Sequence, residues 1–190
     1  SGAGTPFRGG IRNYPDKETH KSNPKWVVED GSQCLEFDGV GTHVILGNET
    51  IPRRGPYRVS FSIKPMSDKD QTVLAHYGHY IGSLALNLND GKLTGVRTNR
   101  KMERIPLDSG LKVKTGEWSD VTVDYNLSNL TFTVNGVKSA PIPCEGPGLY
   151  VGVTTVGGFG AKPKANEFVG RNGWFKGYLK NLRVSQLPKE

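Results

Sequence analysis

Apolar and polar residues alternate along much of the chain, with the period of two that places successive side chains on opposite faces of a β-strand. The clearest example is residues 57–64, in which Val59, Phe61 and Ile63 share one face and polar residues share the other. Similar runs, each bounded by turn residues, occupy residues 35–37, 44–46, 71–77, 80–88, 92–97, 118–125, 130–134, 148–155 and 174–184. Strands with one buried and one wet face are typical of antiparallel sheets packed in two layers.

Turn signals between these runs support the same fold class. Asp90-Gly91 and Asn135-Gly136 predict tight hairpins, because these residue types accept positive φ at little cost. Leu179 and Leu182 break strict alternation in the last run and predict a β-bulge between them. No segment of useful length has a helical period. The sequence therefore predicts an all-β domain, a two-sheet antiparallel jelly-roll sandwich.

The two ends of the chain differ in composition. Residues 1–25 are rich in Gly, Pro and charge and lack periodicity, which predicts an N-terminal linker or strap, whereas residues 26–190 form the predicted sandwich. Residues 157–173 predict a functional loop, since about 17 residues exceed the usual connection in a compact domain. No stretch approaches the roughly 20 apolar residues of a membrane-spanning helix. The first four residues look like a processed start, so we expect a piece of a longer protein.

Four segments, in this order and spacing, resemble the laminin-G-like branch of the concanavalin A-like lectin/glucanase superfamily: Cys34–Gly39, Trp118–Asn126, Leu130–Gly136 and Phe175–Val184. The resemblance extends from residue 26 to residue 185. It implies two curved sheets whose first and last strands are adjacent, so that Leu35 and Phe37 lie against the strand that carries Phe175 and Leu182. It also implies that Trp118 belongs to the core, while Trp26 is expected to pack the N-terminal strap.

Charge and cysteine content narrow the partners only slightly. The net charge is +7, from 25 Lys and Arg against 18 Asp and Glu, which favours anionic partners such as acidic polysaccharides. The basic residues near Arg97 and Arg100 are either an ordinary solvated face or a rim for sulfated or uronic sugars. No aromatic and basic ladder accompanies them, so nucleic acid is not expected. Cys34 and Cys144 exclude a Cys-rich zinc motif and leave open a disulfide or two buried thiols.

Enzymes on this fold need residue patterns that the chain lacks. Glucanases of the superfamily use carboxyl groups about 5 Å apart. Glu36 and Asp38 have i, i+2 spacing, but they lie in a strand that is structural in this branch of the superfamily. Asp38 precedes Gly39 and is interpreted as a turn former. The lyase motifs Gln-x-His and Arg-x-Glu-x-Arg and the Gly-x-Ser-x-Gly elbow are missing. The chain is therefore predicted not to be an enzyme.

Metal binding has little support in the sequence. The resemblance leaves room for one structural calcium, with Asp38, Asp90 and Asn181 as candidate oxygen donors. No calcium-loop spacing supports these residues, and the two histidines His76 and His79 are too few to predict zinc. No metal or other cofactor is predicted.

Two segments that contain aromatic residues are candidates for ligand binding. Tyr77, His79 and Tyr80 surround a glycine at a strand turn, and such side chains offer apolar faces to sugar C–H groups and polar tips to hydroxyls. Trp174 follows the long loop, points outward by alternation and lies close to Arg171. In each case the alternative is structural, with the aromatic side chains capping the core edge or sealing one end of the sandwich.

These observations predict a non-catalytic carbohydrate-binding or adhesion module, part of a larger secreted or cell-surface protein that processes polysaccharides. Its partner would be a glycan, with acidic glycans included, and other domains of a parent chain are further candidates. The predicted contact residues are Tyr77, His79, Tyr80 and Trp174, with Arg97, Arg100 and Arg171 for anionic groups. The alternatives are a structural or protein-interaction domain packed on a parent enzyme, and a polysaccharide lyase or glycosidase on the same fold.

Overall fold

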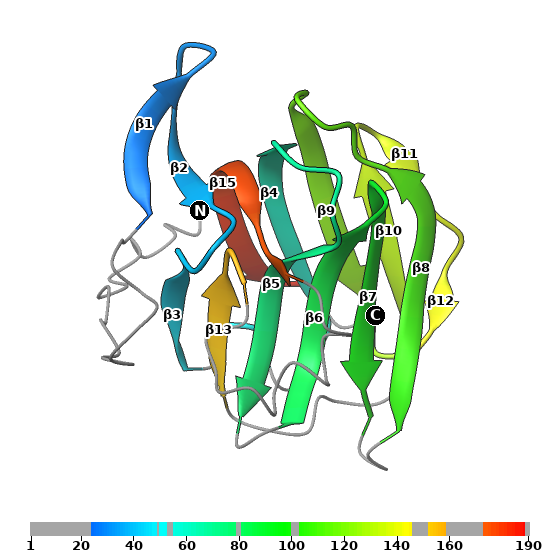
Figure 1. The fold of residues 1–190 in the computed structure, drawn as a ribbon. Helices are drawn as coiled ribbons and strands as arrows, with labels where there is room; N and C mark the ends of the chain where they lie inside the picture. Colours follow the sequence, from blue (N-terminus) through cyan, green and yellow to red (C-terminus); the bar gives the residue numbers. More distant parts are fainter. Residues whose placement is uncertain are drawn as a thin grey trace.

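The computed structural model describes residues 24–48, 50–52, 55–78, 81–99, 103–145, 152–158 and 173–188. Across these residues the chain forms β-strands in two sheets that pack face to face, and they contain no helix (Figure 1). The two-sheet antiparallel sandwich predicted from the alternation is therefore confirmed. Within the same residues, no helix is long and apolar enough to cross a membrane.

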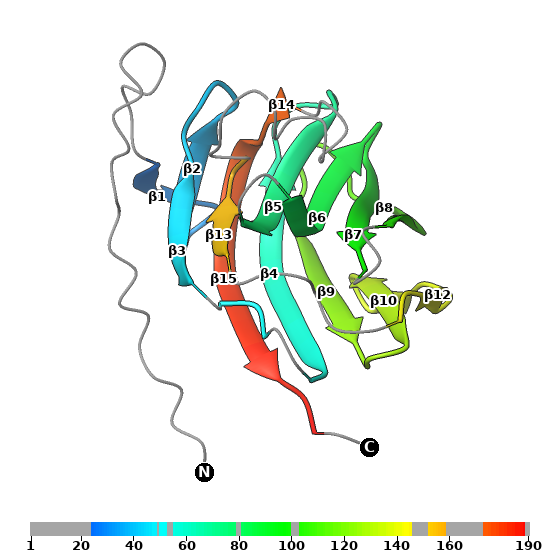
Figure 2. The same cartoon turned by 90° about the horizontal axis from the view of Figure 1, so that it is seen from below.

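The first sheet has eight strands, which follow the order β1 (Lys25–Glu29), β2 (Ser32–Asp38), β15 (Lys176–Gln186), β4 (Tyr57–Pro65), β9 (Ser119–Tyr125), β10 (Asn129–Val134) and β11 (Val137–Lys138), with β12 (Ile142–Pro143) also paired to β10. The second sheet has seven, in the order β3 (Val44–Asn48), β13 (Val153–Val156), β5 (Gln71–Gly78), β6 (Ile81–Asn89), β7 (Lys92–Thr98) and β8 (Arg104–Lys112), with β14 (Gly173–Trp174) paired to β5. Viewed from below, β1, β2 and β3 lie at the same edge of the sandwich (Figure 2).

The core lies between the sheets and is built from the predicted alternating residues. Val59, Phe61 and Ile63 of β4 are each at most 3% exposed. The ring of Phe37 packs edge to face on that of Phe175, with 5.7 Å between their centroids. Burial of these side chains removes apolar surface from water, at roughly 25 cal/mol per Å².

The strands near the two ends of the chain are adjacent, as the resemblance implies. Strand β15 runs antiparallel to β2, with Leu179 opposite Leu35 and Gly177 opposite Phe37. Gly177 has φ of 147°, and a Cβ at this position would come within 2.3 Å of the Lys64 carbonyl oxygen. A glycine is therefore required where β15 begins to pair with β4, opposite Pro65.

The predicted hairpins and the predicted bulge are present. Asp90 and Gly91 have φ of 49° and 68°, and Asn135 and Gly136 have 49° and 82°, as tight two-residue hairpins require. The register of β15 against β4 shifts between Lys180 and Arg183, which confirms a bulge between Leu179 and Leu182.

Several local predictions need correction. Residues 98–117 were not among the alternating runs recognised in the sequence, but β8 lies there, because Pro106 and Ser109 disguise its alternation. Part of the strand predicted at 148–155 lies outside the described residues, and its described part, β13, ends at Val156. Trp118 is only half-buried and lies outside the core, where its Nε1 donates to Asp30 Oδ2 at 3.0 Å.

The two cysteines are separate buried thiols. Cys34 and Cys144 are 0% and 1% exposed, and neither is in a disulfide. Burial raises the pKa of both thiols, because it disfavours the charged thiolate. Of the two alternatives left open by the sequence, the structure has the buried thiols.

Candidate functional site

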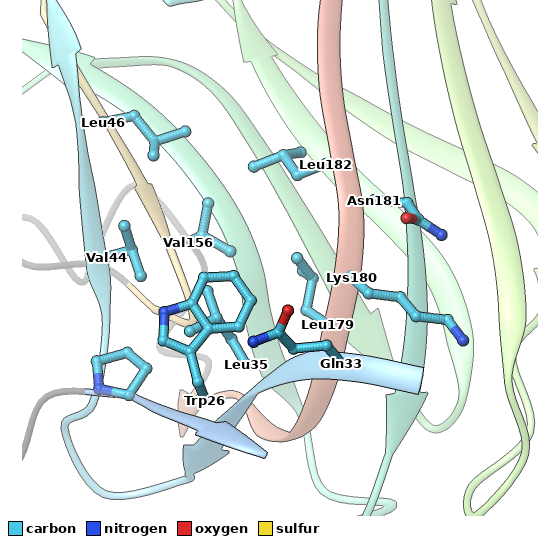
Figure 3. Close-up of a pocket in the computed structure, with 11 residues that line it drawn as sticks. Trp26, Gln33, Leu35, Val44, Leu46, Val156, Leu179, Lys180, Asn181 and Leu182 are labelled. Carbon is cyan, nitrogen blue, oxygen red and sulfur yellow. The ribbon is translucent and has the colours of Figure 1, made fainter. Parts of the chain in front are cut away.

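A groove opens between the two sheets (Figure 3), at the edge where β1, β2 and β3 lie. Trp26, Leu35 and Leu179 are cross-strand neighbours on the core-facing side of the eight-stranded sheet. The exposed fraction rises along this row from 3% at Leu179 to 65% at Trp26. The second sheet therefore stops covering the first before its last strand, and a groove of about 490 Å³ remains.

The wall of the groove is aliphatic and comes from both sheets. Figure 3 shows the side chains that line it, namely Leu35, Leu179 and Leu182 from one sheet and Val44, Leu46 and Val156 from the other. The innermost of them are fully buried, with Leu46 at 4% and Val156 at 1% exposed. This end of the groove can accept apolar groups, and the aliphatic side chains there cannot hydrogen-bond a polar one.

The mouth of the groove is different in chemistry. The indole of Trp26 lies across the opening, with the exposed amide of Gln33 beside it (Figure 3). Pro24 completes the rim, and Val28, two residues along β1, is 73% exposed. A flat aromatic surface next to an amide can stack on the apolar face of a ligand while hydrogen-bonding its polar edge.

Trp174, a predicted contact residue, lies elsewhere. It pairs in register with Thr72 on the outer face of the seven-stranded sheet. Its ring packs beside His43, with centroids 5.4 Å apart. A Cβ on Gly158 would fall 2.0 Å from the same ring, so the indole rests directly on that glycine. This half-buried, packed position favours the structural alternative over an open stacking platform.

Arg97 was expected on a basic rim at the surface, and the structure corrects that placement. Its side chain is 2% exposed and points into the sandwich. The guanidinium donates to the Cys144 carbonyl at 2.9 Å and lies 4.2 Å from the centre of the Tyr125 ring. Burial raises the pKa of Tyr125 and of its neighbour Tyr57, so both rings stay neutral beside the cation.

The other predicted contacts lie largely outside the described residues. The backbone of Tyr77 belongs to β5, but its side chain is outside the description. His79, Tyr80, Arg100 and Arg171 also lie outside it, so their role as glycan contacts stays a prediction. Trp26, which the sequence assigned to packing, was missed. The sequence feature that could have identified it is an apolar side chain at a core-facing position in an edge hairpin.

A polar row crosses the outer face of the seven-stranded sheet from the position of Trp174. Thr72, Asn87, Thr94 and Asp108 are successive cross-strand neighbours on β5, β6, β7 and β8. Thr72 and Asn87 are buried, and among the described residues Thr72 Oγ1 and Asn87 Oδ1 have no hydrogen-bond partner. The row therefore lowers the stability of the fold, because a buried polar group without a hydrogen bond is unfavourable.

The structure does not support a calcium site at the candidate oxygen donors. Asp38 Oδ1 accepts hydrogen bonds from the backbone of residues 40–42 and from Thr42 Oγ1. Partial burial alone would raise the pKa of Asp38, but these hydrogen bonds outweigh it and lower the pKa from 3.8 to about 2. Asn181 donates to Ser62. Among the described residues, no group of three or more His, Cys, Asp or Glu side chains could hold a metal ion.

Comparisons with known proteins agree with this architecture. The sequence profile of the laminin G domain matches residues 66–187. Domain 4 of AbnA, an extracellular GH43 arabinanase from Geobacillus stearothermophilus solved with arabinotriose, is similar in structure, with a TM-score of 0.68 and 14% identity over 89% of this chain and 78% of that chain. No curated protein matches in sequence.

Two further solved structures resemble the chain. Domains LG4-5 of the mouse laminin α1 chain give a TM-score of 0.65 and 18% identity, over 81% of this chain and 43% of that chain. A heptameric SAP-like pentraxin from Limulus polyphemus gives 0.58 and 17%, over 80% and 76%. At these identities the likeness shows the fold alone.

Proposed function

The chain belongs to the laminin G domain family, and on that premise we propose that it is a non-catalytic carbohydrate-binding module. The observation that carries the proposal is the 65% exposed indole of Trp26 at the mouth of the groove, beside the Gln33 amide. The ring would stack on the C–H face of a sugar, and the amide would bind its hydroxyls. A structurally similar domain of an arabinanase was solved with arabinotriose, which supports a glycan as ligand.

The chemistry of the acidic residues supports a binding role over a catalytic one. Asp38, one carboxylate of the i, i+2 pair in β2, accepts hydrogen bonds from backbone N–H groups, and its pKa is lowered to about 2. A general acid for glycoside cleavage needs a raised pKa instead. The partner carboxylate Glu36 pairs across strands with Lys25 and Tyr178, on the face of the sheet opposite the groove.

The proposed setting is a larger extracellular protein that acts on polysaccharides. One groove with a single exposed aromatic ring gives weak, reversible binding. Tethering to a parent chain would raise the effective concentration at the polymer without any new contact. The structurally similar arabinanase domain comes from an extracellular enzyme, which supports this setting.

A protein-interaction role is the second candidate, favoured by the same edge. Strand β1 is the outermost strand of its sheet, and both Trp26 and Val28 on it are exposed. An unpaired strand edge with exposed apolar side chains can also receive another chain. The two candidate functions are distinguished by whether the chain, without any protein partner, binds a glycan.

The test is native affinity electrophoresis through gels that contain neutral or acidic polysaccharides, at low and high salt. We expect at least one neutral polysaccharide to retard the chain and Trp26→Ala to abolish the retardation. Val137→Ala is the matched control, since Val137 is 60% exposed at the opposite edge of the same sheet. Absence of retardation throughout the panel would favour the protein-interaction role instead.

A further inference from the structure

We infer that the groove is specific for an uncharged glycan that carries an apolar substituent, with the sugar on Trp26 and the substituent inserted between the sheets. This inference rests on the proposed function and names the ligand class of the same site. Its first support is the split between the mouth, which has an aromatic ring and an amide, and the wall, which has six aliphatic side chains. A volume of about 490 Å³ is in the range of small-ligand sites.

The charged groups near the groove are directed away from it. Lys180 contributes its stem to the lining, but its Nζ lies 4.1 Å from the centre of the Trp118 ring on the other face of the sheet. Figure 3 shows the side chains of Lys180 and Asn181 pointing away from Trp26. An anionic sugar would therefore find no cation in the described lining to compensate for its loss of water.

The charged side chains of the β1–β2 hairpin also point away from the groove. Lys25 and Glu36 are paired in register and alternate with Trp26 and Leu35, so they occupy the opposite face. Glu29 accepts a hydrogen bond from Lys64, which lies on that outer face as well. The hairpin thus presents a neutral face to the groove and a charged face to solvent.

The aliphatic wall excludes an unsubstituted sugar from the inner part of the groove. Each sugar hydroxyl that moved past Trp26 toward Leu46 and Val156 would give up hydrogen bonds to water and gain none. An alkyl, acyl or aryl group has the opposite balance. Each buried methylene contributes about 0.8 kcal/mol, which is roughly a fourfold gain in affinity. The wall therefore selects for an apolar group attached to the sugar.

The experiment measures binding of methyl, butyl and hexyl glycosides of glucose, galactose and xylose by titration, below their micelle concentrations. We expect the affinity to rise about fourfold per methylene until the groove is filled, with no dependence on salt. The variant Val44→Thr replaces a half-buried wall residue with a polar side chain of the same shape and should flatten the dependence on chain length. Hexyl glucuronide should bind no better than hexyl glucoside.

The outcomes separate this inference from the proposed function. Retardation by a polysaccharide that needs Trp26, combined with equal affinities for methyl and hexyl glycosides, would overturn the inference and leave the proposed function intact. Tighter binding of hexyl glucuronide, lost at high salt, would also overturn it. If hexanol bound as well as hexyl glycosides and no polysaccharide retarded the chain, both the inference and the proposed function would fail.

Discussion

The carboxylate of Asp38 closes the turn after β2, and the variant Asp38→Asn tests how much that turn contributes to stability. Oδ1 accepts hydrogen bonds from Val40 N at 2.8 Å, from Gly41 N and Thr42 N at 3.1 Å, and from Thr42 Oγ1 at 2.8 Å. These donors favour the charged form and lower the pKa of Asp38 from 3.8 to about 2. Asparagine keeps the shape and one acceptor oxygen but loses the charge.

The magnitude follows from the change in pKa. The difference between 3.8 and about 2 corresponds to roughly 2.5 kcal/mol. Asp38 is only partly covered and remains largely accessible to solvent, so solvent screening reduces the contribution to roughly 1 kcal/mol. Because the folded-state pKa is lowered, this contribution is present above about pH 4 and is lost as the pH falls toward 2. At pH 7 the variant should therefore lose roughly 1 kcal/mol, or about 2–4 °C in Tm.

The assay is urea unfolding of the wild type and Asp38→Asn at neutral and acidic pH, followed by tryptophan fluorescence. The difference in the free energy of unfolding should be present at pH 7 and mostly lost near pH 2, where about half of the Asp38 carboxyl groups in the folded protein are protonated. Asp68→Asn is the control, since Asp68 is an exposed aspartate before β5, and it should change stability little at either pH. An equal loss at both pH values would refute the reasoning, because the charge would then be irrelevant.

Three further predictions concern stability and reactivity. Thr72→Val should raise the free energy of unfolding by about 1 kcal/mol, because it removes a buried hydroxyl that has no partner in the described part of the chain; a loss measured by chemical denaturation would contradict this. Gly177→Ala should cost at least about 3 kcal/mol, since its Cβ would lie 2.3 Å from the Lys64 carbonyl oxygen, and a Tm near that of the wild type would count against it. Cys34 and Cys144 should react with a thiol reagent only after denaturant is added, and reaction in the native state would show that they are accessible.

The alternation of apolar and polar residues predicted the strands and the bulge that depend mainly on neighbouring residues. The alternation of residues 57–64 identified β4 and its buried face, and the break between Leu179 and Leu182 identified the bulge. Strand β8 was missed because Ser109 occupies a core-facing position that sequence reasoning reserves for apolar residues. Its hydroxyl donates to the Leu93 carbonyl, a partner that only the pairing of β7 and β8 reveals.

The candidate site depended on contacts between distant segments, which the sequence does not show. The charge of Arg97 suggested the surface, but the residue is buried in β7 like Leu93. The carbonyl of Cys144 that accepts its hydrogen bond is 47 positions away in the sequence. Trp26 likewise occupies a core-facing position. It is exposed because β3, the edge of the other sheet, leaves β1 uncovered. The exposure of Trp26 depends on how the edges of the two sheets are placed, which only the complete fold determines.

The most direct test of the account uses the indole N–H signals of the three tryptophans in a two-dimensional ¹H–¹⁵N NMR spectrum. A neutral polysaccharide fragment that retards the chain is titrated in, and the signals are assigned by single Trp→Phe variants. The account predicts that the Trp26 signal shifts with saturation, while those of Trp118 and Trp174 stay in place. A saturating shift of Trp174 with Trp26 unchanged would contradict it and would move the site to the outer face of the seven-stranded sheet.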